Sequence, residues 1–286
     1  MTRALVGAVI GVGHMGGLHA TKLDAREDVR VRRIDPVRGY EDSLRGIDFA
    51  IVAVPTRSHA EVAAPLLERG IPVLVEKPLA ATSAEAQALA EHPHCFCGHI
   101  ERFNPAVRAM SARMEAPVQF VQSERIAPPL SRGTDVDVLR DLMVHDLDLV
   151  GWLLDGAIVD VKANGVAVRN DGFDIAHARI ETGTGGVATL TASRVARRSV
   201  RTMRAFTERA YWNLNLREGR VERVRWADGQ LEGEQIDVPV GDALDAEHDA
   251  LLAAVRGVSD FPVTGQHALR ALRMAEAVQD DIERRL

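Results

Sequence analysis

Cysteine is scarce in this chain, which has only Cys95 and Cys97 among its 286 residues. They alternate with Phe96 on a predicted strand, so the two thiols need not face each other, and no second pair completes a zinc site. We therefore expect both cysteines to be reduced and buried. The histidines and carboxylates also lack a spacing typical of metal ligands, so we expect no metal.

The chain also lacks an excess of positive charge and any long apolar run. Its net charge of −6 gives no overall attraction to nucleic acid or to an anionic membrane. No apolar stretch approaches the length that spans a bilayer, and the apolar N-terminus leads directly into a glycine turn, which favours a first strand over a signal peptide. We expect a cytoplasmic protein with no nucleic acid and no membrane as partner.

A glycine-rich turn follows the first apolar run, residues 4–10, and a second strand pattern ends at Asp35. The order of strand, glycine turn, helix, strand and acid is that of a dinucleotide-binding βαβ unit. The glycines let the backbone turn tightly and approach a pyrophosphate at a helix N-terminus. We therefore predict that the cofactor contacts Gly11, Val12, Gly13, His14, Met15, Gly16 and Asp35.

The acidic residue at the end of the second strand bears on which dinucleotide binds. Asp35 can accept hydrogen bonds from the ribose hydroxyls and repel a 2′-phosphate, which favours NAD over NADP. Arg32, Arg33 and Arg38 lie close by in the sequence, and one of them could hold that phosphate instead. NAD is the expected cofactor, and NADP stays open.

Strands and helices continue to alternate up to about residue 100. Buried strand patterns at 48–54, 72–75 and 94–100 alternate with helical patterns, which predicts a doubly wound parallel sheet. Thr82 and Glu85 form a capping box for one of the helices. The link over 37–47 is short, so one crossover is trimmed.

After about Pro117 the pattern changes to short strands joined by turns, with one long helix over 136–154 and two closing helices. We predict an α/β protein with an N-terminal Rossmann domain and a C-terminal α+β domain built on a large, open, mainly antiparallel sheet. The predicted domains are 1–116 and 117–264. The last helix, 265–286, is expected to pack back on the Rossmann domain.

Two segments carry side chains suited to catalysis. Lys77 follows a parallel strand at the edge where ligands bind in such sheets, although it could be an ordinary surface lysine beside a turn proline. The 136–154 helix is apolar on nearly every side but carries Asp141, His145 and Asp148 on one face. We predict that His145 faces a substrate hydroxyl, that Asp141 orients it or binds a second hydroxyl, and that Asp148 holds structure. A purely structural network is the alternative, and Asp146 points off this face.

The remaining polar candidates are less specific. Arg102 could bind an anionic part of the substrate as a bidentate fork, or it could form an ion pair that braces the domains. Among the histidines, we expect His14 to line the pyrophosphate turn and His59 to approach the cofactor. The others near turns and helix starts are expected to be incidental, namely His19, His92 and His94.

Taken together, these motifs resemble the Gfo/Idh/MocA family of NAD(P)-dependent oxidoreductases. The resemblance covers nearly the whole chain in order, through the glycine turn, Val54-Pro55-Thr56 with His59, Glu76-Lys77-Pro78, Arg102-Phe103-Asn104-Pro105, the Asp141/His145/Asp148 helix and Pro262-Val263-Thr264-Gly265.

The resemblance implies hydride exchange between the nicotinamide and a sugar or cyclitol, and a homodimer or homotetramer formed through the C-terminal sheet. It implies catalysis by Lys77, Asp141 and His145. Further cofactor contacts would come from Val54, Pro55, Thr56, His59, Glu76 and Lys77, and substrate contacts from Lys77, Arg102, Asn104, Asp141 and His145.

Within the family, residues 98–106 and 141–148 look most like members that oxidise the 3-hydroxyl of UDP-N-acetylglucosamine. The segments after the second strand and before the long helix, including Ser131 to Asp135, are shorter than usual, which leaves the substrate open. Alternatives are a cyclitol or free-sugar dehydrogenase, a carbonyl reductase, or a dinucleotide-binding sensor without turnover. A sensor would need none of Lys77, Asp141 and His145.

Overall fold

The computed structural model describes residues 3–35, 43–129, 137–169 and 172–286. Arg38, the loop Ser131 to Asp135 and the predicted start of the long helix lie outside them. The chain divides into two compact units, one comprising Met1–Ile100 with Ala243–Leu269 and the other Glu101–Asp242 with Arg270–Leu286.

This division differs from the predicted domain boundaries. The helix after Asn104 belongs to the second unit, because Val107 and Met110 are buried in that unit's core. Residues 243–264 belong instead to the first unit. Most of the last helix belongs to the second unit, where Met274 and Val278 enter the core, and its first turn belongs to the first unit. That the helix packs back on the Rossmann domain stays a prediction.

The first unit contains a five-stranded parallel sheet in the order β2-β1-β3-β4-β5. Its register aligns Ile10, Val52 and Val75, so the segments after β1, β3 and β4 leave the sheet at one edge. Ligands bind at such a carboxyl edge where the strand order reverses. The strands are β1 (Leu5–Ile10), β2 (Val29–Ile34), β3 (Phe49–Val52), β4 (Val73–Glu76) and β5 (Cys95–Gly98).

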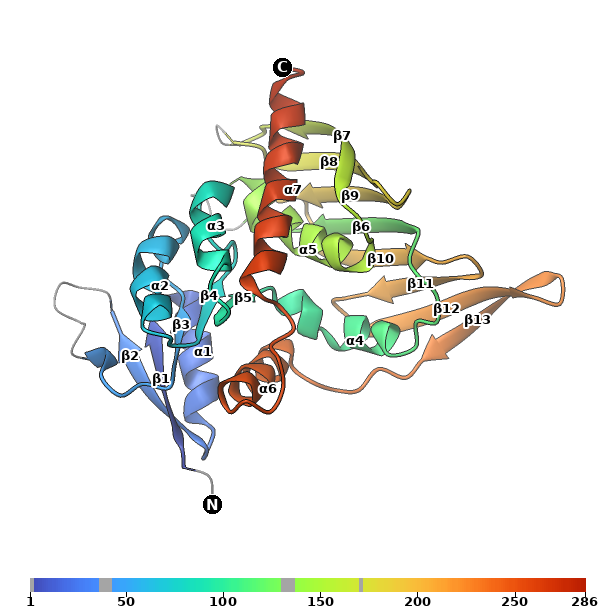
Figure 1. Ribbon diagram of the computed structural model, residues 1–286. Helices are drawn as coiled ribbons and strands as arrows, with labels where there is room; N and C mark the ends of the chain where they lie inside the picture. Colours follow the sequence, from blue (N-terminus) through green and yellow to red (C-terminus); the bar gives the residue numbers. More distant parts are fainter. Residues whose placement is uncertain (1–2, 36–42, 130–136, 170–171) are drawn as a thin grey trace. The chain divides into compact units, whose positions relative to one another are not determined.

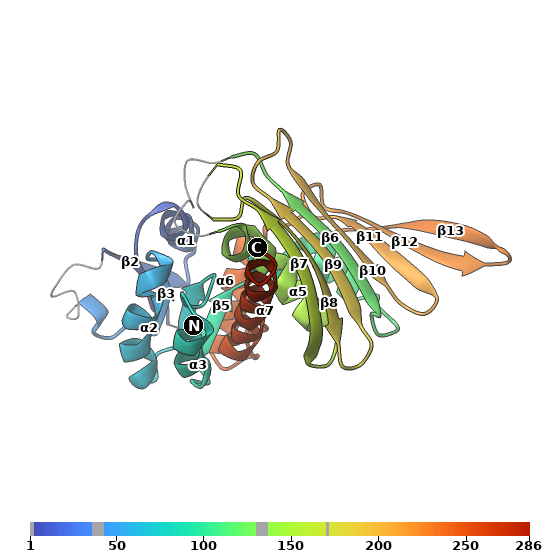
Figure 2. The same ribbon diagram turned by 90° about the horizontal axis from the view of Figure 1, so that it is seen from above.

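Helices cover both faces of this sheet (Figures 1 and 2). One face carries α1 (His14–Asp24), and α6 (Ala243–Val255) lies beside it. The other face carries α2 (His59–Glu68), which follows η2 (Thr56–Ser58), and α3 (Ser83–Ala90). The predicted cap of α3 is confirmed, since Glu85 N donates to Thr82 Oγ1 at 3.2 Å.

The two cysteines lie on β5, where both are buried and free. Burial raises the pKa of the Cys95 thiol to about 12, so this thiol stays protonated and unreactive. The prediction of reduced, buried cysteines is confirmed.

The second unit contains an eight-stranded sheet in the order β13-β12-β11-β10-β6-β9-β8-β7. It is mainly antiparallel, but β6 and β9 pair in parallel, so the expected antiparallel sheet is in fact mixed. The strands are β6 (Phe120–Ile126), β7 (Ile158–Val166), β8 (Ile175–Thr182), β9 (Val187–Ser193), β10 (Val200–Phe206), β11 (Ala210–Asn215), β12 (Arg220–Ala227) and β13 (Gln230–Ile236).

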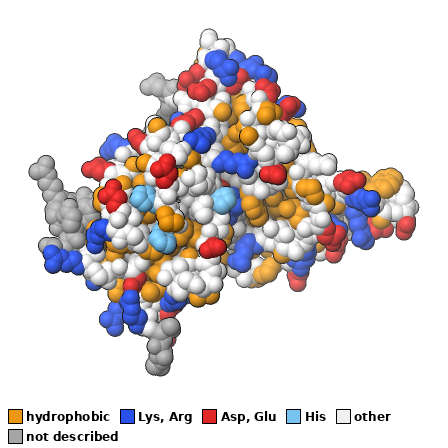
Figure 3. Space-filling view, viewed as in Figure 1, with side chains coloured by type: hydrophobic (Ala, Val, Ile, Leu, Met, Phe, Trp, Pro, Cys, Tyr) orange, Lys and Arg blue, Asp and Glu red, His pale blue; other side chains and the backbone are white. Residues whose placement is uncertain are grey.

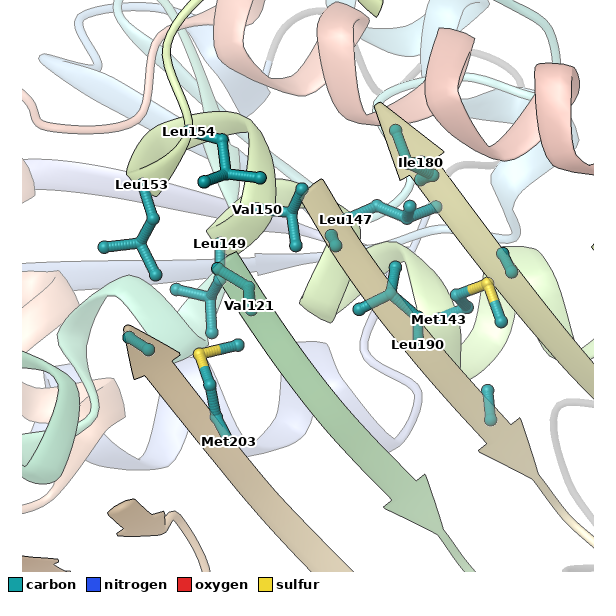
Figure 4. Close-up of a cluster of buried hydrophobic side chains, with 14 of the residues drawn as sticks. Val121, Met143, Leu147, Leu149, Val150, Leu153, Leu154, Ile180, Leu190 and Met203 are labelled. Atoms are coloured by element: carbon teal, nitrogen blue, oxygen red, sulfur yellow. The ribbon is translucent and has the colours of Figure 1, made fainter. Parts of the chain in front are cut away.

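Helices of this unit pack on one face of the sheet and form its core. Figure 4 shows Leu147 and Val150 of α5 meeting Leu190, Ile180 and neighbouring side chains of the sheet, all in the same buried cluster. The helical elements are η3 (Ile100–Phe103), α4 (Pro105–Ser111), the π-helix η4 (Leu139–Met143), α5 (Val144–Leu153) and, from Arg270 onward, α7 (Gly265–Glu283).

The surface carries charges of both signs. On the face seen in Figure 3, acidic and basic side chains are interspersed rather than gathered into one field. Within the described residues, no helix is both long and apolar enough to cross a membrane.

Candidate active site

Backbone approach at the glycine turn explains why these positions are glycines. Gly11 has φ +88°, and a Cβ there would lie 2.7 Å from Val54 N. At Gly16 a Cβ would lie 1.8 Å from Gly11 O, so the helix can start this close to β1 only without a side chain. Gly13, the N-cap of α1, has nothing within 4 Å of its Cβ position.

The start of α1 fits the pyrophosphate of a dinucleotide. Within the described residues, no side chain caps this helix, and its first turn holds no acidic residue. Val12, Gly13 and His14 are exposed. Unsatisfied N–H groups together with the helix dipole favour an anion at this point.

The arginines beside Asp35 are engaged elsewhere. The Arg32 guanidinium donates to the carbonyls of Ser43 and Arg45 at 2.8 and 2.7 Å, and Arg33 pairs with Asp24. Asp35 itself is exposed directly after β2. Contact of the Asp35 carboxylate with a ribose stays a prediction.

His59 ties together two of the turns at the ligand edge. It is 1 % exposed, with Nδ1 2.8 Å from the carbonyl oxygen of Pro78 and Nε2 2.9 Å from that of Val54. Burial lowers the pKa of His59, although both carbonyls favour the protonated ring. Both ring nitrogens contact backbone carbonyl groups, so His59 holds the two turns in place. Its direct contact with the cofactor stays a prediction.

The Glu76 side chain is buried, whereas Lys77, the next residue, is partly exposed. Glu76 Oε1 lies 2.8 Å from His19 Nε2, and His19 Nδ1 lies 2.8 Å from His248 Nε2. The expectation that His19 is incidental was wrong, because its imidazole is fully buried and holds this carboxylate. The Lys77–Pro78 peptide bond is cis.

In the second unit, the long predicted helix is divided into a π-helical turn, η4, and α5. Asp137 caps the start, where its Oδ1 accepts from the backbone N–H groups of Leu139 and Arg140 at 3.0 Å. Asp141 lies within the π turn and His145 follows in α5, both half-buried. Such turns widen the helix locally and are frequent at functional sites.

Two arginines pair with the two aspartates of α5. Arg102 holds Asp148 through two hydrogen bonds of 2.7 and 3.0 Å, and Arg125 holds Asp146 in the same way at 2.9 and 3.0 Å. Arg125 also donates to Glu101 at 2.7 Å. Burial alone would raise the pKa of Glu101, but the charge of Arg125 lowers it below its ordinary value. All five side chains are buried, so Asp148 holds structure as predicted.

These contacts bear on the two predicted substrate ligands near residue 100. The Arg102 guanidinium forms an ion pair with Asp148 within the second unit rather than one between domains, and it lies 4.8 Å from the centroid of the Trp152 ring. Asn104 caps α4 by accepting from Ala106 N at 3.0 Å, and it donates to the Leu216 carbonyl. Both residues are engaged within the second unit, and their roles in substrate binding stay predictions.

Comparison with known proteins decides the family. A family model described as "Oxidoreductase family, NAD-binding Rossmann fold" matches residues 23–93, and one for the "GFO/IDH/MocA C-terminal domain" matches residues 106–212. The chain belongs to the Gfo/Idh/MocA family. This is a family of NAD(P)-dependent dehydrogenases that act on CH–OH groups, so the resemblance seen in the sequence is confirmed.

Individual relatives agree with this assignment. UDP-N-acetylglucosamine 3-dehydrogenase from Acidithiobacillus ferrooxidans is 33 % identical over 96 % of this chain and 98 % of its own. Its solved structure has a TM-score of 0.91 and covers 99 % of both chains. Myo-inositol dehydrogenase Hyg17 from Streptomyces leeuwenhoekii is 30 % identical over 56 % of this chain and 59 % of its own. Levoglucosan dehydrogenase in complex with NADH, at 16 % identity and a TM-score of 0.84, shows the same fold over 99 % of this chain and 98 % of its own.

We expect Gly16→Ala to weaken dinucleotide binding strongly, because the added Cβ would meet Gly11 O and force α1 away from β1. A rise in Kd of more than about tenfold is expected in a titration followed by NADH fluorescence. Gly17→Ala is the matched control, since its Cβ would reach only Val12 O, at 4.0 Å. Equal affinity in both variants would contradict this role for Gly16.

We expect Glu101→Gln to destabilise the fold in a pH-dependent way. The folded pKa of Glu101 is lowered, so its contribution is present above the ordinary glutamate pKa and is lost as the pH falls through the folded value. The free energy of unfolding should drop by about 1–3 kcal/mol at neutral pH. Urea unfolding at several pH values should show this difference shrinking below about pH 4.

Glu115→Gln is the control for this measurement, because the Glu115 side chain is 78 % exposed. It should change stability by less than about 0.5 kcal/mol at every pH. A constant loss for Glu101→Gln across the pH range would mean that the charge of Glu101 is not what stabilises the fold.

Proposed function

We propose that this protein is an NAD-dependent dehydrogenase that oxidises a hydroxyl of a nucleotide sugar, the 3-hydroxyl of UDP-N-acetylglucosamine. The observation that carries the proposal is full-length similarity to the Acidithiobacillus ferrooxidans enzyme of that activity. The local sequences around Arg102 and His145 point the same way.

In the proposed mechanism, His145 takes the proton of the substrate hydroxyl as general base, since histidine titrates near neutral pH. Asp141, one turn earlier and half-buried, orients the imidazole or binds a second hydroxyl. The Lys77 ammonium group stabilises the oxygen as negative charge develops on it. The nicotinamide, when bound, supplies the acceptor for the hydride that leaves carbon.

The cofactor site is proposed to prefer NAD over NADP. Asp35 is exposed at the end of β2, while Arg32 donates to two backbone carbonyls and Arg33 pairs with Asp24. A 2′-phosphate would therefore meet a carboxylate without either of these arginines to neutralise it.

The second candidate is oxidation of a cyclitol, which is favoured by the similarity to a myo-inositol dehydrogenase over about half of the chain. A carbonyl reductase of the same family would use the same residues in reverse. A sensor without turnover is disfavoured, because it has no use for Lys77, Asp141 and His145.

We further propose that the protein forms a homodimer or homotetramer through the eight-stranded sheet. A hollow on this sheet is lined by polar side chains of three adjacent strands, among them Gln122, Thr202 and Asn213. Polar side chains can pair across such a surface between two copies of the chain.

We expect Asp35→Ser to shift the cofactor preference towards NADP. Removing the carboxylate removes both the ribose acceptor and the repulsion of the 2′-phosphate. The ratio of kcat/KM for NAD+ to that for NADP+ should fall by about tenfold or more. Glu68→Ser removes an exposed carboxylate at the end of α2 instead and serves as the control. An unchanged ratio in Asp35→Ser would contradict the proposed contact.

We expect the purified protein to reduce NAD+ when given UDP-N-acetylglucosamine, with a carbonyl trap to draw the equilibrium forward. Lys77→Ala and His145→Ala should each lower kcat by about 10²- to 10⁴-fold. Lys162→Ala is a matched control, since that side chain is 60 % exposed in the second unit. Normal turnover in both active-site variants would exclude this site, and NAD binding without turnover would direct the search to inositols and free sugars.

A further inference from the structure

A buried polar cluster lies beneath the Glu76-Lys77-Pro78 turn and has no part in the mechanism given so far. It comprises His19 of α1, Glu76 at the end of β4, and Glu247 and His248 of α6, all in the first unit. His19 and Glu247 are 0 % exposed and His248 is 1 % exposed. Ionisable groups are rarely buried so completely without a purpose.

The hydrogen bonds of this cluster connect α6 through α1 to the lysine turn. His19 Nε2 donates to Glu76 Oε1 at 2.8 Å, and His248 Nε2 lies 2.8 Å from the other ring nitrogen of His19. The second oxygen of Glu76 accepts from the backbone N–H of Lys77 at 3.2 Å. Gly98 on the neighbouring strand leaves the carboxylate just enough room, since a Cβ there would lie 3.3 Å from it.

Glu247 differs from the other three members. Within the described residues, neither of its carboxyl oxygens has a hydrogen-bond partner, although both are buried. Burial, and then the charge of Glu76, raise the pKa of Glu247 well above its usual value. Burial alone would raise the pKa of Glu76 as well, but His19 and the charge of Lys77 lower it. Of these two nearby carboxyl groups, Glu76 is therefore the ionised one and Glu247 the neutral one.

We propose that Glu76 is a positioning residue for Lys77: His19, in contact with His248, fixes the Glu76 carboxylate, which accepts from the Lys77 backbone N–H. Glu247, whose buried oxygens have no hydrogen-bond partner within the described residues, is the neutral carboxyl of the cluster. The charged and titratable groups that act on Glu76 are His19, His59, Lys77 and Glu247, contributed by α1, α2, the turn after β4 and α6. This inference rests on the proposed function in one respect, which is that Lys77 is catalytic.

The chain offers a clean test because it has only three lysines, Lys22, Lys77 and Lys162. The free protein is treated with a trace of isotope-labelled acetic anhydride at about pH 8, where amines are partly deprotonated. Peptide mass spectrometry then gives the labelling rate of Lys77 relative to that of the exposed Lys162. This readout needs neither cofactor nor substrate.

Glu76→Gln keeps the shape of the side chain but removes the carboxylate charge that interacts with Lys77. The Lys77 to Lys162 ratio should rise by about three- to tenfold. Glu247→Gln imitates the neutral acid, so its ratio should equal that of the wild type. Glu91→Gln, at an exposed position after α3, is the control for removal of a remote carboxylate.

An unchanged ratio in Glu76→Gln overturns the proposal, and a lower melting temperature alone would mark a merely structural role. A raised ratio in Glu247→Gln also overturns it, because Glu247 would then be charged. If Glu76→Gln fails to fold, the infrared difference spectrum between wild type and Glu247→Gln at about pH 7 tests the proposal instead. A protonated carboxyl band from Glu247 would support it, and an ionised carboxylate band would overturn it. A raised ratio in Glu76→Gln, together with a wild-type protein that shows no dehydrogenase activity, would refute the proposed function and leave this inference standing.

Discussion

Bidentate pairing of two arginines with two aspartates fixes the helix on which the proposed chemistry depends. Arg102 and Arg125 hold Asp148 and Asp146 inside the second unit, where an unpaired charge would be strongly destabilising. A fork with two parallel bonds constrains rotation as well as position. The orientation of α5, and with it the direction of His145, is therefore set by charges that no substrate needs to touch.

The fold of the first unit could be predicted from local pattern, because its central strands are buried on both sides and read as continuous apolar runs. The glycine spacing and the acid after β2 completed the pattern. In the second unit β8 alternates apolar and polar residues, as in Ile175 to Ile180, so its strand is marked by a local pattern. β13 is mostly exposed and offers almost no apolar signal. The parallel pairing of β6 with β9 depends on sheet order, which no local pattern encodes.

The residues of the candidate site could likewise be predicted only where the signal lies within one local segment. Lys77, Asp141 and His145 could be found because each stands out within its own segment, by a strand end or by a polar face on an apolar helix. Their supporting partners could not, since Arg102 and Asp148 are 46 residues apart and His19 and His248 are 229 apart. A histidine in α1 next to a glycine turn gives no sign that it meets a second histidine near the end of the chain. The π turn at Asp141 was hidden for a related reason, since its sequence is compatible with a regular helix.

The first unit is completed by a segment that is made late. Residues 243–269 belong to it, and they supply the second histidine of the buried pair. Synthesis proceeds from the N-terminus, so His19 and Glu76 leave the ribosome long before their partner exists. The nascent Rossmann unit must remain open on its α1 face until almost the whole chain has emerged. Because residues 270–286 return to the second unit, each unit is built from two separate segments, and shortening the chain before α6 would remove a part of both.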